Sequence, residues 1–388
     1  MSPGQPDDAA LDDPAALADL DRDGMLLAVA TAGAQVREAL VLVEPETLAA
    51  LAGDRPRAVV VTGMGGSGIA ADVATAVAGR TCPVPVVAHR GHRLPGWVGP
   101  MDLVVAVSCS GGTEETLSAT DEALRRGAQV VTVGAAGSPL AARSDGGRAL
   151  HLRVDAHGRM PRANLWGLAV PVLMVLDAVG LADVPRDLLS RTADELDRLA
   201  EHCAPAVDSL ENPAKAIALQ LAGTLPYIWG ASEVASVAAA RTAAQLAENA
   251  KYPAVHGPLT EVHHNQVVVM AGVFGALASD GADDDIFRDR VDDGPGRPRL
   301  RLLVLRDTDE VPEVTRRADA SHRVAERYNV VSSELRAEGE HPLSRLASLV
   351  AVLDFATVYL ALAQGIDPSP IAPIVALKAG LAEGGLGL

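Results

Sequence analysis

Residues 59–72, VVVTGMGGSGIAAD, place the strongest constraint on the fold. A run of valines that ends at a glycine turn and continues into an alanine-rich segment predicts a buried strand, a tight turn and a helix. Residues 102–126 and 223–250 have the same pattern. Strands that alternate with helices along a chain predict an α/β fold in which helices flank parallel sheets.

The predicted elements divide the chain into two halves. Strands are expected at residues 57–63, 84–90, 102–112, 128–135 and 149–154, and again at 223–232, 299–307 and 328–335. Helices are expected at residues 67–78, 113–126, 162–180, 185–203, 233–250, 311–329, 343–363 and 370–381. We therefore predict two tandem doubly wound α/β domains, at residues 41–195 and 196–388, after an N-terminal tail and helix in residues 1–40. The acidic segment 280–299 is predicted to be a surface insertion, since it has too little apolar area to order itself.

Charge and cysteine content narrow the class of protein. The 388-residue chain has 33 basic and 50 acidic residues, a net charge of −17, which argues against nucleic acid and membrane surfaces as partners. Three unpaired cysteines and an acidic N-terminus without a signal-peptide pattern predict a cytoplasmic protein. The apolar runs at residues 165–176 and 346–363 are broken by proline or polar residues, so buried helices are expected there.

The glycine turn after the first strand permits two kinds of ligand. Gly63, Gly65 and Gly68 fit G-x-G-x-x-G, and backbone N–H groups at the start of a helix attract either a dinucleotide or a phosphate ester. A dinucleotide site needs a carboxylate about 20 residues further on, and the next strand has none. Arg90 or Arg93 could accept a 2′-phosphate, so an NADP-dependent oxidoreductase stays open at this point.

A second turn lined with hydroxyl groups favours a phosphate ester. Ser108 and Ser110 lie at the end of the predicted strand segment 102–112, Thr113 follows it directly, and the chain then leads into another helix. Two such loops in one parallel sheet converge at the carboxyl ends of the strands, and small hydroxyls supply donors without bulk. The alternative is that these hydroxyls only cap the helix. Together the two loops predict a cradle for a compact phosphomonoester.

Several short motifs in order resemble a known family. G-M-G-G-S-G-I-A and S-C-S-G-G-T-E-E-T resemble the sugar isomerase (SIS) domain. They continue with PRANL, AENAKYPA, TEVHHNQ and DPSPIAPIVALK, which resemble the bifunctional phosphoglucose/phosphomannose isomerases between about residues 59 and 378. The resemblance implies two SIS domains, a homodimer with shared active sites, a sugar-phosphate substrate and no cofactor. The phosphate cradle that it implies consists of Gly66, Ser67, Ser108, Ser110 and Thr113.

The resemblance also assigns roles in aldose–ketose isomerisation. Arg162 of PRANL falls on the arginine near the enediolate, and Glu248 of AENAK on the base that moves the proton between C1 and C2. His264 falls on the ring-opening histidine, which typically reaches across from the partner subunit, and Lys378 on a lysine near the ring oxygen. This reaction requires an anchor for the phosphate, an acid/base that opens the sugar ring, a carboxylate base and a cation that stabilises the enediolate. No hydride leaves the substrate, so no nicotinamide is needed.

The sequence departs from the family pattern at three positions. The usual asparagine of S-G-N-T is Gly112, the usual glutamate after His-Asn is Gln266, and the usual threonine of D-P-T-P is Ser369. Ser369 keeps the hydroxyl, whereas Gly112 and Gln266 are expected to bear on substrate choice or rate. None of the three removes a catalytic group.

Each assigned residue also has a structural interpretation. Glu248 could pair with Lys251 on a helix surface, His264 could be a hydrogen-bonded structural histidine, and Lys378 could face solvent. Arg162 could start a helix and pair with a surface carboxylate. His256, His263 and His264 have no zinc-binding spacing, so no metal is expected. Cys109 is expected to be a small buried residue without a base beside it.

Three functions follow, of which an NADP-dependent oxidoreductase rests on G-x-G-x-x-G alone. The first is a metal-independent isomerase that interconverts glucose-6-phosphate and fructose-6-phosphate through a cis-enediolate, with mannose-6-phosphate as a further candidate substrate. The second is a regulatory or degenerate SIS protein that binds a sugar phosphate without turnover. A pure binding protein would keep the two phosphate loops and could lose Glu248 or His264, so the presence of both favours the enzyme.

Overall fold

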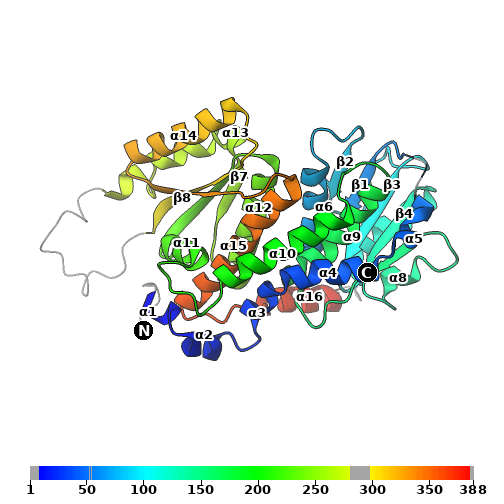
Figure 1. The fold of residues 1–388 in the computed structure, drawn as a ribbon, viewed down its shortest axis with the longest axis horizontal. Helices are drawn as coiled ribbons and strands as arrows, with labels where there is room; N and C mark the ends of the chain where they lie inside the picture. The colour runs from blue at the N-terminus through cyan, green and yellow to red at the C-terminus, as the bar shows by residue number, and fades with distance from the viewer. Residues whose placement is uncertain (1–7, 52, 54, 280–297, 385–388) are drawn as a thin grey trace, which may run out of the picture.

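Two parallel sheets flank a central layer of helices (Figure 1). The computed structural model describes residues 8–51, 53, 55–279 and 298–384. The strands of the first sheet are β1 (Val59–Thr62), β2 (Val86–His89), β3 (Leu103–Ser108), β4 (Gln129–Gly134) and β5 (Leu150–Arg153). Those of the second are β6 (Thr224–Gly230), β7 (Val255–Pro258), β8 (Arg299–Arg306) and β9 (Val331–Arg336). The predicted α/β fold with two parallel sheets and flanking helices is confirmed.

The first sheet has the strand order β2-β1-β3-β4-β5. Val59 pairs with Leu103 and with Val86, which places β1 between β2 and β3. Alternate side chains of β1 pack into two different hydrophobic clusters, one on each face of the sheet, because successive residues of a strand point to opposite faces. Val59 and Val61 join the large central core, whereas Val60 packs with α7 (Glu114–Arg125) on the outer face. The turns after β1 and β3 therefore lie side by side at the carboxyl edge of this sheet.

The second sheet has the order β7-β6-β8-β9. Strand β7 was not predicted, because its four residues include a glycine and a proline and show no alternation of apolar and polar side chains. Among the described strands it pairs with β6 alone, as the edge strand. The outer face of this sheet packs on α13 (Leu259–Val262) and α14 (Pro312–Arg327).

Helices from both halves form the layer between the sheets. They are α6 (Gly65–Ala78), α9 (Leu165–Ala178), α10 (Arg186–His202), α11 (Pro213–Leu221), α12 (Glu233–Asn249) and α15 (Pro342–Ala363). α12 packs on both α6 and α15, so the two sheets share one continuous core. Among the described residues, α15 alone is long and apolar enough to cross a membrane, and its apolar stretch is completely buried within the protein. The predicted junction at residues 195 and 196 falls inside α10.

The N-terminal region contains several short helices in place of the single helix that was predicted. It has α1 (Asp8–Leu11), α2 (Pro14–Leu20), α3 (Met25–Ala30), α4 (Ala32–Leu42) and α5 (Pro45–Leu48). The Asp13 carboxylate caps α2, and Gly24 takes a φ of 69° before α3, a conformation that favours glycine and interrupts helix. α4 packs on α9 and α10 (Figure 1).

The second half contains further short elements and the end of the chain. After α13 come the 3₁₀ turns η3 (Gln266–Ala271) and η4 (Ala276–Ser279), and after α15 comes α16 (Ala372–Gly384). The remaining short helices are η1 (Ala49–Leu51), α8 (Pro139–Ala142) and η2 (Pro161–Ala163). Residues 280–297 of the predicted acidic insertion lie outside the described residues, and Arg299 already belongs to β8.

Candidate active site

The first glycine turn lies against the PRANL segment. Helix α6 begins at Gly65, two residues earlier than predicted. A Cβ atom on Gly66 would lie 2.9 Å from the carbonyl carbon and oxygen of Pro161, so only glycine allows this close approach. Residue 66 of the predicted cradle is therefore in direct contact with the segment that carries Arg162.

The hydroxyl groups of the two loops contact one another. The Ser67 hydroxyl accepts a hydrogen bond of 3.1 Å from the Cys109 backbone N–H, and the Ser108 and Thr113 hydroxyls lie 2.9 Å apart. The Ser110 hydroxyl accepts from the Gly112 N–H at 3.3 Å. Thr113 is the N-cap residue of α7 but makes no capping bond with its side chain. The predicted cradle residues thus gather at one place, and Thr113 does not have the simple capping role that was the alternative.

Arg162 is buried at the junction of the two halves. Its Nε–H donates to Asn249 Oδ1 at 2.7 Å, and its Nη2 donates to the carbonyls of Pro368 and Ser369, each at 3.0 Å. Its Nη1 lies 3.7 Å from Glu248 Oε2. Burial lowers the pKa of Arg162, and the Glu248 carboxylate opposes this shift. An arginine nevertheless stays charged in proteins, so a fixed cation faces this carboxylate.

Glu248 does not form the surface pair with Lys251 that was the structural interpretation. Its side chain, 29% exposed, is directed to Arg162 at the last turn of α12. The Lys251 ammonium instead donates to backbone carbonyls, including that of Glu248. The carboxylate is therefore open to solvent on one side and faces a fixed cation on the other.

A buried polar network holds the backbone of Arg162. Arg241 of α12 forms a two-pronged ion pair with Asp354 of α15, at 2.8 and 2.7 Å. Arg241 Nη2 also donates to the Arg162 carbonyl at 2.8 Å, and Gln245 donates to the same carbonyl at 3.4 Å. Sequence reasoning missed this network, because buried charges on two distant helices carry no local motif.

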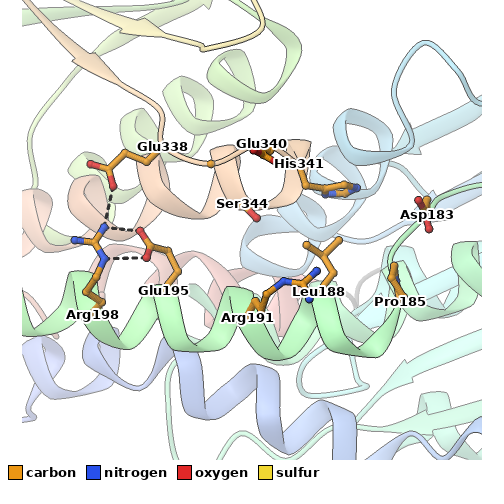
Figure 2. A pocket seen from close by; sticks show the side chains of 11 residues that line it. Asp183, Pro185, Leu188, Arg191, Glu195, Arg198, Glu338, Glu340, His341 and Ser344 are labelled. Carbon is orange, nitrogen blue, oxygen red and sulfur yellow. Dashed lines mark hydrogen bonds and ion pairs between the residues drawn. The ribbon is translucent and has the colours of Figure 1, made fainter.

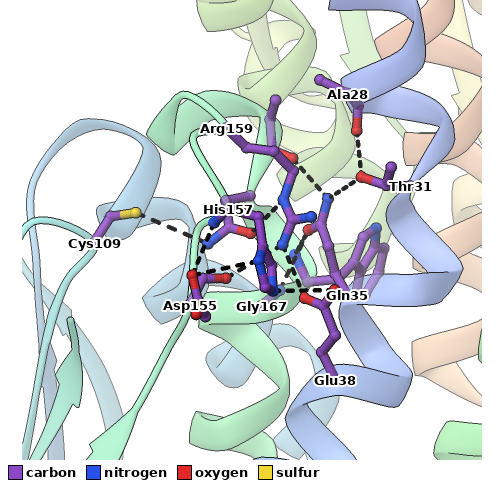
Figure 3. Close-up of polar contacts among 12 residues, drawn as sticks. Ala28, Thr31, Gln35, Glu38, Cys109, Asp155, His157, Arg159 and Gly167 are labelled. Atoms are coloured by element: carbon purple, nitrogen blue, oxygen red, sulfur yellow. Dashed lines mark hydrogen bonds and ion pairs between the residues drawn. The ribbon is translucent and has the colours of Figure 1, made fainter. Parts of the chain in front are cut away.

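The N-terminal region supports the same segment from the other side (Figure 3). The buried Gln35 of α4 donates to the Ala163 carbonyl at 2.7 Å and accepts from the Trp166 and Gly167 N–H groups at 3.2 and 3.4 Å. Arg159 pairs with Glu38 of α4 at 2.9 Å. The N-terminal helix α4 therefore helps to position the PRANL segment. A polar residue on an otherwise apolar helix face was the only signal in the sequence.

Cys109 connects the second loop to this region through Asn164. Its Sγ lies 3.8 Å from Asn164 Nδ2, and the residue is buried. Burial raises the pKa of the thiol, which keeps it protonated, in line with the predicted structural role.

His264 and Lys378 lie apart from these residues. Within the described residues, no hydrogen bond or ion pair joins the side chain of either to the cradle, Arg162 or Glu248, and both are exposed. The neighbouring His263 is the structural histidine: its Nε2 lies 2.8 Å from Ser321 Oγ, and its ring makes an edge contact with Trp229. Burial lowers the pKa of His263, with Arg317 and His264 adding to the shift.

Gln266 has a clear structural reason to be an amide. Its Oε1 accepts from the Trp229 indole N–H at 3.0 Å, and its Nε2 donates to the His256 carbonyl at 3.1 Å. A glutamate at this position could still accept the hydrogen bond from Trp229, but its second carboxylate oxygen would repel the His256 carbonyl oxygen, since it has no hydrogen to donate. A Cβ atom on Gly112 would lie 3.9 Å from Ser110 Oγ, an ordinary van der Waals contact, and the buried Ser369 hydroxyl has no partner among the described residues.

Of the two arginines that were candidates to bind the 2′-phosphate of NADP, Arg90 is engaged elsewhere. Arg90 forms an ion pair with Asp72 and donates to the Gly68 carbonyl at 3.2 Å. Its guanidinium is thus engaged within the chain and is not free to bind a 2′-phosphate. Among the described residues, no group of three or more His, Cys, Asp or Glu side chains is placed to hold a metal ion.

A large cavity lies elsewhere on the molecule (Figure 2). It has a volume of about 540 Å³ between α10 and the start of α15, and none of the predicted site residues lines it. Arg198 on its wall is held between Glu195 at 2.5 Å and Glu338 at 2.8 Å, and more acidic than basic side chains line the space. Such a surface is poorly suited to a phosphate, so the convergence of loops is the better candidate for a sugar-phosphate site.

Comparisons with known proteins agree with this architecture. The SIS domain family matches residues 55–182, and the bacterial phospho-glucose isomerase C-terminal SIS domain family matches residues 210–381. The chain is therefore a protein with two SIS domains. A bifunctional phosphoglucose/phosphomannose isomerase of Caldicellulosiruptor bescii is 30% identical over 326 residues, 84% of this chain and 89% of that protein. The one of Aquifex aeolicus is 29% identical over 83% of this chain and 89% of that protein. The chain belongs to the bifunctional phosphoglucose/phosphomannose isomerase family.

Solved structures support the fold. The C-terminal domain of glucosamine-fructose-6-phosphate aminotransferase from Francisella tularensis has a TM-score of 0.64 at 15% identity, over 90% of this chain and 99% of that one. A hypothetical protein from Thermus thermophilus has a TM-score of 0.67 at 16% identity, over 96% of this chain and 93% of that one. At these identities the likeness concerns the arrangement of the two SIS domains.

Proposed function

We propose that this protein is an aldose–ketose isomerase that interconverts glucose-6-phosphate, fructose-6-phosphate and mannose-6-phosphate without a cofactor or metal. The observation that carries the proposal is the pairing of Glu248 with the buried Arg162, 3.7 Å apart, beside the two hydroxyl-lined loops. A carboxylate next to a fixed cation is the combination that proton transfer through an enediolate needs. Family membership supports the same reaction.

The proposed mechanism divides the work among the chain's own residues. The cradle of Gly66, Ser67, Ser108, Ser110 and Thr113 anchors the phosphate through hydroxyl and backbone N–H donors. Glu248 takes the proton from one of the two carbons C1 and C2 and returns it to the other. The Arg162 guanidinium stabilises the negative charge that develops on the enediolate oxygens. It is already held by Asn249, Pro368 and Ser369, so little reorganisation is needed during the reaction.

His264 and Lys378 are proposed to complete the site in a homodimer, with His264 opening the sugar ring from the partner subunit. Both lie on surfaces that expose apolar side chains in the single chain. In the segment that follows His264 along the chain these are Val268, Val273, Phe274 and Leu277, and on α16 they are Ile374, Val375, Leu377 and Leu381. Exposed apolar patches of this kind mark interaction surfaces. The three free cysteines and the family's metabolic role support a cytoplasmic location.

The shared site predicts complementation between two inactive variants. Glu248→Gln and His264→Ala should each be inactive as homodimers, whereas a mixture allowed to exchange subunits should recover part of the wild-type activity. One of the two sites in a mixed dimer then contains both intact residues. Steady-state rates before and after exchange measure this, and a mixture of Glu248→Gln with Arg162→Lys, both proposed to act within one chain, serves as a comparison. A fully active monomer at assay concentrations would contradict the shared site.

The cradle predicts a loss of affinity without a loss of fold. Ser110→Ala and Thr113→Val should each weaken binding of fructose-6-phosphate by about 1.5–3 kcal/mol, the usual effect of removing one donor to a charged group. Calorimetric titration measures the affinity. Thr75→Val, which removes a hydroxyl bonded within α6, should leave it unchanged. Unaltered binding in both cradle variants would mean that the hydroxyls serve only the local structure.

A single assay separates the proposed enzyme from its alternatives. Purified protein is incubated with fructose-6-phosphate in the presence of EDTA, and glucose-6-phosphate and mannose-6-phosphate are detected separately. Formation of either product supports the metal-independent isomerase. Tight binding without any product would favour the regulatory SIS protein, and loss of activity in EDTA that zinc restores would overturn the metal-free mechanism. Binding of NADPH, followed by its fluorescence, would revive the oxidoreductase.

A further inference from the structure

Lys251 lies two residues beyond the end of α12, after the C-cap residue Ala250, in an unusual backbone conformation. The helix ends at Asn249, and Lys251 has a φ of 53°, in the left-handed region. Glycine or asparagine normally takes this place after a helix, because other side chains are strained there. A lysine that accepts such strain suggests that its side chain serves a purpose, as strained residues often do near active sites.

The Lys251 ammonium joins two segments of the candidate active site. It lies 3.1 Å from the carbonyl oxygens of Glu248 and Asn249, which the end of the helix leaves without partners. On the other side it lies 3.1 Å from the carbonyl of Asp367 and 3.0 Å from that of Pro368. Four carbonyls thus surround one ammonium group, and they belong to segments more than 100 residues apart in the sequence.

Arg162 binds the second of these segments from its own side. Its Nη2 donates to the carbonyls of Pro368 and Ser369, so Lys251 and Arg162 share the Pro368 carbonyl. The charged groups that face the Lys251 ammonium are Arg162, Asp367 and Glu248. Burial lowers the pKa of Lys251, and Arg162 adds to the shift while Asp367 and Glu248 oppose it. The two cations therefore both bind residues 367–369, while Lys251 holds the Glu248 carbonyl and Arg162 faces the Glu248 carboxylate.

We propose that Lys251 is a positioning residue for isomerisation: its ammonium fastens the end of α12 to residues 367–368 and so sets the Glu248 carboxylate against Arg162. The inference rests on the proposed function of Glu248. Lys251 acts on the substrate only through Glu248 and Arg162, and its contacts within the chain are with main-chain oxygens, so its removal should affect the rate of proton transfer more than substrate binding.

The test is the variant Lys251→Gly. Glycine suits a φ of 53°, so this variant removes the ammonium and also the strain, and it should fold. We expect kcat to fall by about 100-fold, the effect of misplacing a catalytic group by about 1 Å, with KM for fructose-6-phosphate changed by less than about threefold. Lys251→Arg, which keeps a cation, should recover part of kcat. Unchanged kcat in Lys251→Gly would overturn the proposal.

Chemical rescue makes the test specific to the ammonium. Lys251 is exposed, so n-butylammonium, which has the atoms that the glycine variant lacks, can enter the vacated place. It should restore kcat in a saturable manner and raise the unfolding temperature of the variant but not of the wild type. Tetramethylammonium carries the charge but has no N–H donor and should do neither. If n-butylammonium changed neither kcat nor the unfolding temperature of Lys251→Gly, the proposal would also be overturned.

A second lysine provides the matched control. Lys215 is completely buried, and its ammonium donates to the carbonyls of Pro205 and Val207 and to Asp12. Lys215→Ala should lower the unfolding temperature without changing kcat. If the wild type shows no isomerase activity, the proposed function fails, whereas the effect of n-butylammonium on the unfolding temperature still reports on the ammonium site.

Discussion

Glu248→Gln should bind fructose-6-phosphate nearly as well as the wild type and fail to isomerise it. The amide keeps the size of the side chain and one acceptor oxygen for Arg162, 3.7 Å away, but it cannot take a proton from carbon. A positioned general base contributes roughly 10²–10⁴-fold, so turnover should fall by at least that factor. Exchange of the C2 proton of glucose-6-phosphate with D₂O, followed alongside calorimetric affinity, separates binding from proton transfer.

The opposite end of the same helix supplies a control. Glu233→Gln makes the same chemical change in the exposed first turn of α12, away from Arg162, and should leave both affinity and turnover unchanged. If Glu248 were only a surface helix residue, the two variants would behave alike. Exchange at the wild-type rate in Glu248→Gln would end the claim that this residue moves the proton.

Asp354→Asn should give the largest loss of stability among single changes near the site. The variant leaves the guanidinium of Arg241, 4% exposed, without its carboxylate partner in the interior between α12 and α15. Breaking one side of a buried ion pair typically costs about 3–5 kcal/mol, because the remaining charge is uncompensated. Equilibrium unfolding in urea measures the change in free energy, and activity should fall too, since Arg241 also holds the Arg162 carbonyl.

An exposed pair shows whether burial is the cause. Asp187→Asn removes the partner of Arg191 on the surface of α10, where both side chains are about two-thirds exposed. Its free energy of unfolding should stay close to that of the wild type, because water screens such pairs. Equal losses in Asp354→Asn and Asp187→Asn would show that the buried network does not have the role proposed for it.

Strands and helices with a strong local pattern, either a continuous apolar run or an amphipathic repeat, were predicted well. The valine-rich β1 and β3, the buried α9 with Pro171 inside it, and the amphipathic α10 all appear where the pattern indicated, with ends shifted by a few residues. β1, β3 and α9 are apolar and buried along consecutive residues, whereas α10 has its buried side chains at a helical spacing, so in each segment local sequence and tertiary packing agree.

Short segments and long-range contacts were not predictable in this way. Strand β7 is stabilised by its pairing with β6, and only Val255 among its own four residues favours a strand. The contacts of Gln35 with Ala163 and of Arg241 with Arg162 join residues that are 128 and 79 positions apart. Such pairings depend on which helices meet, and a single sequence does not contain that information.

The sequence by itself determined the alternating α/β architecture, the two loops and the motif residues, because each rests on neighbours within a few positions. Only the tertiary structure decided what those residues face. In the structure Glu248 faces Arg162 and not Lys251, and the Lys251 ammonium lies between two segments that are distant in the sequence. His263 is the hydrogen-bonded structural histidine, whereas His264 is exposed. The physical reason is that a side chain's partners are set by the packing of whole helices and sheets, which brings together groups that the chain keeps far apart.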